Sequence, residues 1–496
     1  MRRIVSGFIL TLLLTGMLAL AFNIKPVSAS GTIYIRADGS VEPQDAPIST
    51  VDNVSYTFTG NIYEPIVIER DNIVVDGAGY IIQGTEEKGV TLSGRSNVTI
   101  KNMKIKAFTY NIWLNGSSNI KISGNEITGR EVIWSGEYGI YLKGSSNSVI
   151  FGNKITKKGN GIGLFGLDLS VFSDNNTLSG NEITANPING IFIDVLSKNN
   201  KILGNQITNN GGNGIILYAS KNNTIFENNI TNNKIGIKFY GWSTNNIVSK
   251  NNIAKNAKGI VLEGDVTNTN NLIYHNNFVN NTVQATVVEG FSWSVWDNGY
   301  PSGGNYWSDY ADVDLKKGLE QDQLGSDGIG DSLYDIDANN RDRYPLMAPY
   351  STFEAGTWNE TTYNADVISN STVSDFHFNP EEGPYLKFNV TGEEGTAGFC
   401  RVTIPKDLLW VEDGQWVVLV GGVPTTNYTI TSDGNHSYLY FTYNHSTKTV
   451  LIQGTHVIPE FPSFLIMLLF MTATLLAIIA SRRKRFQHQT GRQHMS

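Results

Sequence analysis

Residues 122–128 read Ile-Ser-Gly-Asn-Glu-Ile-Thr, and residues 150–156 read Ile-Phe-Gly-Asn-Lys-Ile-Thr. The unit returns with successive spacings of 28, 28, 24, 23, 23 and 25 residues, at Asn181, Asn205, Asn228, Asn251 and Asn276. Such scatter is expected when loop lengths vary while one turn of a coil keeps its form. This internal repeat decides the fold.

A second motif, Gly-Ile-x-Leu, alternates with the first. It begins at six glycines, after a degenerate copy at Asn111: Gly139, Gly161, Gly190, Gly214, Gly236 and Gly259. Alternate aliphatic residues predict short strands with one buried side, separated by Gly and Asn turns. Stacking such coils pairs each strand with its equivalent in the next coil. We therefore expect an all-β fold, a right-handed parallel β-helix over the repeats.

The recurrent turn asparagines have an expected role. Asn tolerates the left-handed backbone region, and its amide can bond to the same Asn in the next coil. The open ends of such a helix need caps, because they would otherwise expose strand edges and core. Residues 30–84 read as the N-terminal cap and first coils, followed by the repeats at 85–290.

The coils from about Asn72 to Asn281 resemble the repeats of the NosD-like and carbohydrate-binding/sugar-hydrolase group of β-helix proteins, common on archaeal cell surfaces. A segment at 291–350 resembles the closing segment of that group, through Gly304-Asn-Tyr-Trp-Ser-Asp-Tyr310, Asp327-Gly-Ile-Gly-Asp331 and Asp342-Arg-Tyr-Pro-Leu-Met347. The resemblance covers somewhat over half the chain. It implies an architecture more firmly than an activity.

Beyond the repeats, residues 352–455 alternate strand signals with Gly and Asn turns, which predicts a β-sandwich. The chain has one cysteine, Cys400. A single cysteine excludes a disulfide framework and any Cys-based zinc or iron–sulfur site, so we expect a buried thiol in a strand.

The two ends of the chain predict export and anchoring. Residues 1–29 read as a secretory signal peptide. Residues 463–481 suit a transmembrane helix, and the basic tail at 482–496 predicts that the bulk of the chain lies outside the cell. The linker at 456–462 carries Pro-Glu-Phe, which resembles a C-terminal sorting tail and implies an archaeosortase-like processing enzyme. A plain membrane anchor is the alternative.

Charge narrows the classes of partner. Eight of the 37 Lys and Arg residues lie in the end segments, which leaves 29 bases against 45 acids in the exported part. Phosphate binding depends on clustered basic residues, so this balance argues against nucleic acid as a partner. Sequons from Asn53 to Asn444 fit an exported glycoprotein.

Candidate binding residues follow from the strand pattern. In each Gly-Ile-x-Leu-y strand, x and y point to solvent on one sheet face, and stacking turns them into two columns. Aromatic faces beside carboxylates suit sugar rings, whose C–H faces lie on aromatics while hydroxyls bond to acids. The glycan-binding candidates are Trp113, Tyr141, Phe192, Asp194, Tyr218, Tyr240, Trp242 and Glu263. The alternative is that these side chains cover the sheet against a loop or the sandwich.

Catalysis on this scaffold would need convergent groups, such as two carboxylates or a base with a cation clamp. The motifs of polygalacturonases and alginate epimerases are absent, although scattered acids could still pair across a face: Asp168, Asp174, Asp194 and Glu227. We therefore expect non-catalytic recognition of an envelope polysaccharide or glycoprotein, or envelope scaffolding. A polysaccharide-active lyase, epimerase or hydrolase is one alternative.

A NosD-like periplasmic factor for metal-protein maturation is another alternative, because the family name carries a copper association. Copper favours clustered His, Met and Cys, whereas the five histidines before the C-terminal tail are dispersed: His275, His377, His436, His445 and His456. Calcium favours oxygen ligands in flexible acidic loops. The sequence predicts a structural calcium site at Asp322, Asp327, Asp331 and Asp335, with a solvated acidic turn as the alternative.

Overall fold

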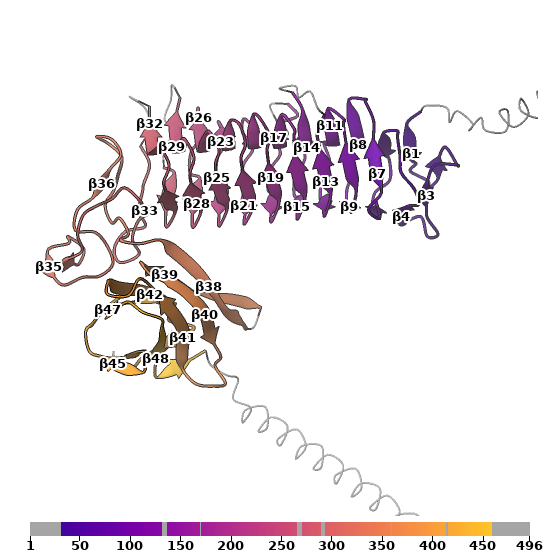
Figure 1. Cartoon of the computed structure of the whole chain (residues 1–496). Coiled ribbons are helices and arrows are strands. Elements are labelled where there is room, and N and C mark those ends of the chain that lie inside the picture. The colour runs from indigo at the N-terminus through magenta and orange to yellow at the C-terminus, as the bar shows by residue number, and fades with distance from the viewer. Residues whose placement is uncertain are drawn as a thin grey trace, which may run out of the picture. The chain divides into compact units, whose positions relative to one another are not determined.

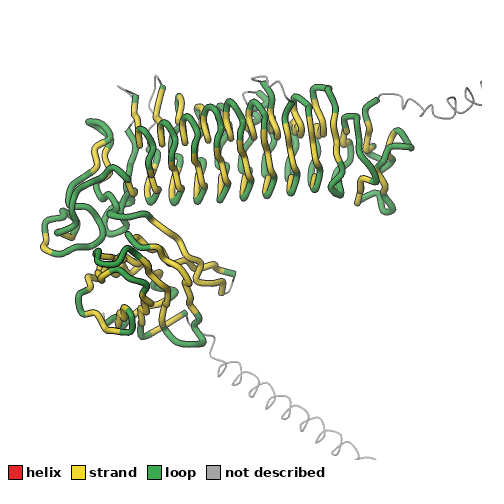
Figure 2. The backbone as a smooth tube through the Cα atoms, viewed as in Figure 1, coloured by secondary structure: helices red, strands yellow, loops and turns green. Residues whose placement is uncertain are grey.

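The computed structural model describes residues 31–130, 136–168, 170–264, 270–288, 293–358, 360–412 and 415–458. These ranges consist of strands joined by loops, as Figure 2 shows. Within them, no helix is long and apolar enough to cross a membrane. The predicted signal peptide at 1–29, the transmembrane helix at 463–481 and the tail at 482–496 lie outside the described residues. So does the Pro-Glu-Phe motif of the linker.

The chain divides into two compact units. The first comprises Met1–Asn271 and Asn280–Ser294, and the second comprises Leu272–Val279 and Val295–Ser496. The second unit therefore groups two short strands near the end of the repeats with the closing segment and the sandwich. The other domain boundaries stay predictions.

The first unit is a parallel β-helix whose coils stack along one axis (Figure 1). Its first sheet, which carries the candidate columns, is capped by the antiparallel pair β1 (Ile33–Ile35) and β2 (Val41–Glu42). The parallel strands that follow are β5 (Ile66–Ile68), β8 (Lys88–Ser93), β11 (Tyr110–Asn115), β14 (Tyr138–Lys143), β17 (Asn160–Phe165), β20 (Asn189–Ile193), β23 (Asn213–Tyr218), β26 (Ile235–Tyr240), β29 (Lys258–Glu263) and β32 (Val283–Val287).

Two further sheets complete each coil. One contains β3 (Ile48–Ser49), β4 (Ser55–Phe58), β6 (Ile73–Asp76), β9 (Val98–Lys101), β12 (Lys121–Ser123), β15 (Val149–Phe151), β18 (Thr177–Ser179), β21 (Lys201–Leu203), β24 (Thr224–Phe226) and β27 (Ile247–Ser249). The other contains β7 (Ile81–Gln83), β10 (Lys104–Lys106), β13 (Glu126–Thr128), β16 (Lys154–Thr156), β19 (Glu182–Thr184), β22 (Gln206–Thr208), β25 (Asn229–Thr231) and β28 (Asn252–Ala254). The predicted parallel β-helix is confirmed.

Between the sheets, asparagines form buried ladders along the axis. In one ladder each side-chain amide donates to the carbonyl oxygen of the next coil's asparagine over 2.9–3.0 Å, through Asn125, Asn153, Asn181, Asn205, Asn228 and Asn251. The left-handed backbone falls on the residue just before: φ is +64° at Gly124 and +55° at Glu227. The prediction that one asparagine takes both roles therefore fails in this ladder. It holds in the first coils, where the side-chain amide of Asn97 (φ +55°) donates to the carbonyl oxygen of Asn72 (φ +58°) over 2.9 Å. In the ladders, the left-handed backbone and the amide bond belong to two adjacent residues. This explains the Asn-Asn doublets, in which Asn222 has a φ of +56° and its neighbour Asn223 belongs to a ladder.

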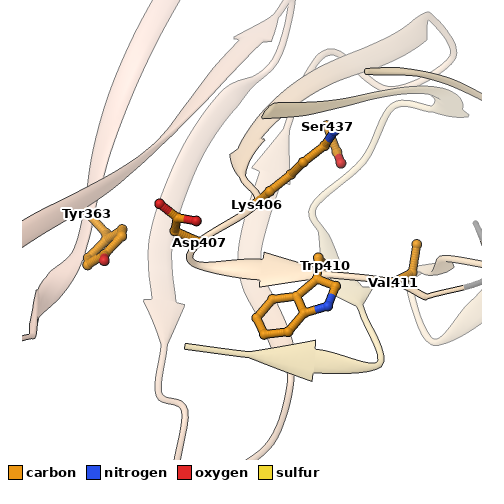
Figure 3. A pocket seen from close by; sticks show the side chains of 6 residues that line it. All are labelled: Tyr363, Lys406, Asp407, Trp410, Val411 and Ser437. Carbon is orange, nitrogen blue, oxygen red and sulfur yellow. The ribbon is translucent and has the colours of Figure 1, made fainter. Parts of the chain in front are cut away.

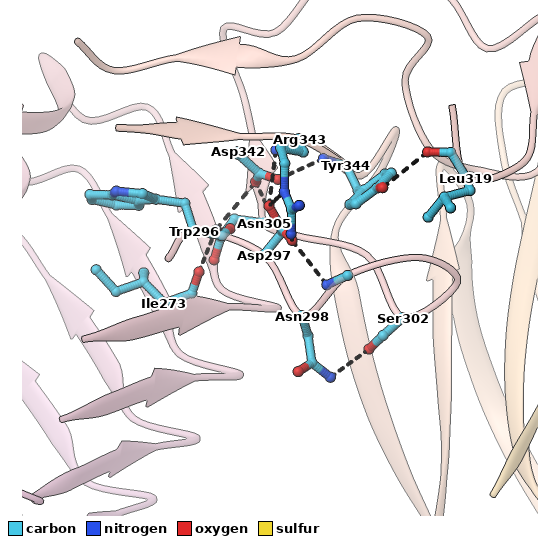
Figure 4. Close-up of polar contacts among 11 residues, drawn as sticks. Ile273, Trp296, Asp297, Asn298, Ser302, Asn305, Leu319, Asp342, Arg343 and Tyr344 are labelled. Carbon is cyan, nitrogen blue, oxygen red and sulfur yellow. Dashed lines mark hydrogen bonds and ion pairs between the residues drawn. The ribbon is translucent and has the colours of Figure 1, made fainter. Parts of the chain in front are cut away.

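The second unit begins with β30 (Leu272–Tyr274) and with β31 (Asn277–Val279), which pairs in parallel with β33 (Tyr306–Trp307). Two short antiparallel pairs follow, β34 (Lys316–Lys317) with β35 (Gln323–Leu324) and β36 (Tyr334–Asp335) with β37 (Arg341–Asp342). Here Asn276 donates its amide to Asn305 over 2.9 Å. Asn305 in turn donates its backbone N–H to the buried carboxylate of Asp342 over 2.7 Å, and Figure 4 shows these two residues. Asp342 thus takes the place of a further asparagine.

Two antiparallel five-stranded sheets make up the remainder of the second unit. One contains β38 (Tyr350–Trp358), β39 (Thr361–Ser369), β42 (Ala397–Pro405), β47 (His436–Asn444) and β46 (Tyr428–Ser432). The other contains β40 (Thr372–Phe378), β41 (Tyr385–Thr391), β48 (Lys448–Gln453), β44 (Val417–Val420) and β45 (Val423–Thr425), and β43 (Leu409–Trp410) pairs separately with β49 (His456–Val457). The sheets share one apolar core, as predicted for a sandwich, and Cys400 lies fully buried within it.

Candidate functional site

The first sheet of the β-helix places the two predicted columns in register. Trp113 pairs with Tyr141, Tyr141 with Gly163, and Gly163 with Phe192. In the other column, Tyr218 pairs with Tyr240, and Tyr240 pairs with Glu263. The spacing of the repeat was therefore sufficient to predict which side chains neighbour one another along the sheet.

Six aromatic residues near the middle of this sheet contact one another and are called the aromatic stack: Tyr110, Trp113, Tyr138, Tyr141, Phe165 and Phe192. The rings of Trp113 and Tyr141 are nearly parallel with centroids 4.6 Å apart, and those of Tyr141 and Phe165 follow at 4.7 Å. Phe165 then meets Phe192 edge-on at 5.1 Å. The stack presents a continuous apolar strip over four successive strands, β11 to β20.

Tyr138 belongs to the stack but was missed from the sequence. Strict alternation would send it inward, since it stands two residues before the buried Ile140. Instead Gly139 also faces the core, where an added Cβ would lie 2.6 Å from Cγ2 of Ile155. Two consecutive inward residues return Tyr138 to the outer face. The sequence did contain a signal for this position: a tyrosine directly precedes the second motif both at Tyr138 and, one coil earlier, at Tyr110, and the two tyrosines pair in the sheet.

Gly163 gives Tyr138 its space. A Cβ at Gly163 would lie 2.5 Å from Cε1 of Tyr138 and 2.6 Å from Cε2 of Phe165. The gap in the x column is therefore filled by a ring from the adjacent strand. Glycine at this point allows the rings to approach the sheet backbone.

Asp194 lies beside the aromatic stack, at the end of β20. Its backbone N–H donates to the carbonyl oxygen of Leu164 over 2.8 Å, and burial raises the pKa of its carboxyl group. Burial also raises the pKa of Tyr141 to about 12, and the charge of Asp194 adds to that rise and to the rise at Tyr138. The charge of Asp194 thus acts on both tyrosine side chains. A hydrogen-bond acceptor thus stands at the border of an apolar strip.

A second aromatic group lies on β23 and β26. The rings of Tyr218 and Tyr240 are 5.2 Å apart, and they are 36% and 39% exposed. Trp242, just beyond β26, is 58% exposed. The ammonium of Lys238 lies 5.1 Å from the centre of the Tyr240 ring and 2.9 Å from the carboxylate of Glu263. All eight glycan-binding candidates therefore belong to one sheet or its margin, in two groups.

The acidic segment of the second unit uses its carboxylates within the protein. Asp331 accepts backbone N–H bonds from Leu315 and Lys316 over 3.0–3.1 Å. Asp327 accepts a bond from the backbone N–H of Ile329, over 3.1 Å. Asp335 lies 3.8 Å from the guanidinium of Arg341.

Asp314 was missed by the sequence interpretation of this segment. It accepts the backbone N–H groups of Asp327 and Gly328 over 2.9 and 2.7 Å, while burial raises its pKa to about 7. Among the described residues, no three His, Cys, Asp or Glu side chains gather as a metal site would require. Calcium binding by Asp322 and its neighbours stays a prediction.

Other side chains that could bind a metal make contacts within the protein. The ring of His275 stacks on Tyr350 with centroids 4.3 Å apart, and His445 bonds Ser371 through Nε2 over 2.8 Å. Asp168 accepts bonds from the backbone of Ser170 and Val171 at its own turn. The described residues thus do not fit a copper site.

Comparison with known proteins agrees with this geometry. Residues 66–230 match the family described as right handed beta helix region, and residues 170–312 match the family described as periplasmic copper-binding protein (NosD). The repeat is a right-handed β-helix. Each match covers less than half of the chain. No curated protein matches the chain significantly.

Solved structures are similar to the chain at a low level. The A-module of mannuronan C-5 epimerase AlgE4 from Azotobacter vinelandii shares 16% identity over 53% of this chain and 91% of its own, with a TM-score of 0.36. The tailspike protein of Escherichia coli bacteriophage HK620 shares 11% identity over 86% of this chain and 87% of its own, with a TM-score of 0.38. Similarity at these scores supports no inference about activity.

Proposed function

We propose that the protein recognises a polysaccharide or glycoprotein glycan, without catalysis, through the outer face of its first sheet. The observation that carries the proposal is the pair of aromatic groups in register along that face, one beside Asp194 and one beside Glu263. Parallel strands repeat at about 4.8 Å, so the aromatic side chains form a row along which successive sugar residues can lie. The partner we propose is a component of the cell envelope.

The expected location of the protein outside the cytoplasm is a second, weaker support for this proposal. The family matched by residues 170–312 is described as periplasmic, which agrees with the export predicted from the N-terminal residues. Anchoring by the segment at 463–481, processing by an archaeosortase-like enzyme and glycosylation of the sequons are further parts of the proposal. An exported protein would meet envelope glycans directly.

The test is binding to an array of neutral and acidic polysaccharides by the double variant Tyr218→Ala/Tyr240→Ala. Each ring contributes about 1 kcal/mol to a stacking contact, so we expect binding to weaken at least about tenfold. The fold should be unaffected because both side chains are substantially exposed. The matched control is Tyr80→Ala, since Tyr80 is 38% exposed but lies before β7, on another sheet.

Two outcomes would contradict the proposal. Equal retention of the double variant and the parent chain on every glycan would remove the platform. Release of shortened or epimerised products that Asp194→Asn abolishes would instead favour the polysaccharide-active enzyme. Asp194 is the residue to change because it follows β20 at the border of the aromatic stack and its carboxyl group has a raised pKa.

A further inference from the structure

The two-sheet part of the second unit contains a cavity of about 610 Å³ (Figure 3). Its walls come from four separate strands or their ends: β39, the turn after β42, β43 and β47. The residues that line it are Tyr363, Lys406, Asp407, Trp410, Val411 and Ser437. Nothing in the chain's repeats or motifs indicated this site.

Trp410 provides an aromatic wall that is held in place. Its ring stacks on His456 with centroids 5.1 Å apart and an angle of 13° between the planes. The two residues also pair through their backbones in β43 and β49. His456 is itself fixed, because it lies 2.9 Å from Oγ1 of Thr455 and 3.4 Å from the carboxylate of Glu412. An indole fixed before binding loses little conformational entropy when a ligand arrives.

Polar groups of both kinds surround this ring. Asp407 is exposed and contributes two acceptor oxygens. The ammonium of Lys406 donates to the backbone carbonyl of Asp433, which positions it, and a lysine has two further N–H donors. Ser437 and Tyr363 add hydroxyl groups to the lining. Hydroxyl-rich ligands need such a mixture, because each sugar hydroxyl both donates and accepts.

We propose that this cavity is a saccharide-binding site that holds one to three pyranose rings of a neutral glycan. Its volume lies within the range of small-ligand sites. An apolar sugar face would lie on Trp410, and equatorial hydroxyls would bond to Asp407 and Lys406. A cationic ligand is disfavoured by the lysine, and a strongly anionic one by the aspartate. This site is independent of the function proposed for the first sheet.

The test is saturation-transfer NMR on the full chain, kept in a detergent without a sugar head group. The probes are four neutral trisaccharides: maltotriose, cellotriose, mannotriose and N,N′,N″-triacetylchitotriose. We expect at least one to receive saturation on its ring protons. The substitution Trp410→Ala should weaken the binding of that trisaccharide about tenfold or more.

Further variants separate this site from others and from loss of folding. Asp407→Asn keeps the shape of an exposed side chain and should weaken binding several-fold, whereas Glu381→Gln, also exposed in this unit, should leave it unchanged. The Tyr218→Ala/Tyr240→Ala variant should bind through the cavity as the parent does. The proposal is overturned if no probe receives saturation, or if binding survives both cavity substitutions. Loss of binding only in the Tyr218→Ala/Tyr240→Ala variant would overturn it too, and would leave the first sheet as the binding surface.

Discussion

Lys158 lies where one asparagine ladder ends, and its side chain bonds to an earlier coil. Its backbone N–H donates to Asn186, the first member of another asparagine ladder. Its fully buried ammonium donates to the carbonyl oxygen of Phe108 over 2.7 Å and lies 3.4 Å from the buried carboxylate of Glu137. Burial lowers the pKa of Lys158 to about 8, and the attraction of Glu137 offsets only part of that effect.

This lowered pKa predicts a pH dependence of stability. Between pH 8 and 10.5 the unfolded chain keeps the Lys158 proton and the folded protein releases it, so the contribution of this group rises with pH in that window. The full rise is about 3 kcal/mol. Denaturant unfolding from pH 7.5 to 10.5 should therefore show the parent gaining stability relative to Lys158→Met. A constant difference between the two would contradict burial of a charged lysine, and Lys104→Met, at an exposed position, is the control.

At the scale of the coil, two adjacent asparagines in one turn have different roles. Asn228 is 1% exposed, accepts the amide of Asn205 and donates to the carbonyl oxygen of Ile202 and to Asn251. Asn229 begins β25 and accepts a bond from Asn252 at the surface. Buried amides in a ladder satisfy backbone groups that no water can reach. At the surface, by contrast, a polar group that loses its bond to Asn229 can bond to water instead.

We therefore predict that Asn228→Ala lowers the free energy of unfolding by about 2–4 kcal/mol, because it leaves buried backbone and amide groups unpaired. Asn229→Ala should change it by about 0.5 kcal/mol or less. Chemical denaturation of the two variants measures both values under the same conditions. Similar losses for the two variants would show that the ladder does not stabilise the coils.

At the scale of the whole molecule, Arg401 joins the closing segment to the sheets within the second unit. It is 1% exposed, and its guanidinium donates to the backbone carbonyls of Asp327, over 2.8 Å, and of Pro301. It also lies 4.9 Å from the centre of the Tyr438 ring. The segment 295–350 has few regular strands, so contacts of this kind hold it in place.

Replacing Arg401 with methionine should release this segment before the sheets unfold. Two buried carbonyls would lose their donor, at about 1–3 kcal/mol for each. Limited proteolysis with mass spectrometry should show faster cleavage within 295–350, while cleavage in β38 to β48 stays slow. Arg341→Met, which alters an exposed arginine, should leave the pattern unchanged. Uniform acceleration across the unit would contradict this specific role.

The sequence by itself determined the parallel β-helix, the register of its coils and the pairing of candidates such as Tyr218 with Tyr240. These features depend on spacing along the chain, because a periodic pattern of apolar residues repeats the same strand in every coil. The burial of Cys400 followed from the same kind of local pattern.

Only the tertiary structure decided how Tyr138 fills the space at Gly163, that the charge of Asp194 acts on two tyrosines, and that Trp410 and Tyr363 share a cavity. These side chains meet across strands, at bends where strict alternation fails, as at Gly139 and Ile140. Such contacts depend on the direction of the chain after each bend and on the space between neighbouring side chains. The periodicity of a single segment specifies neither of them.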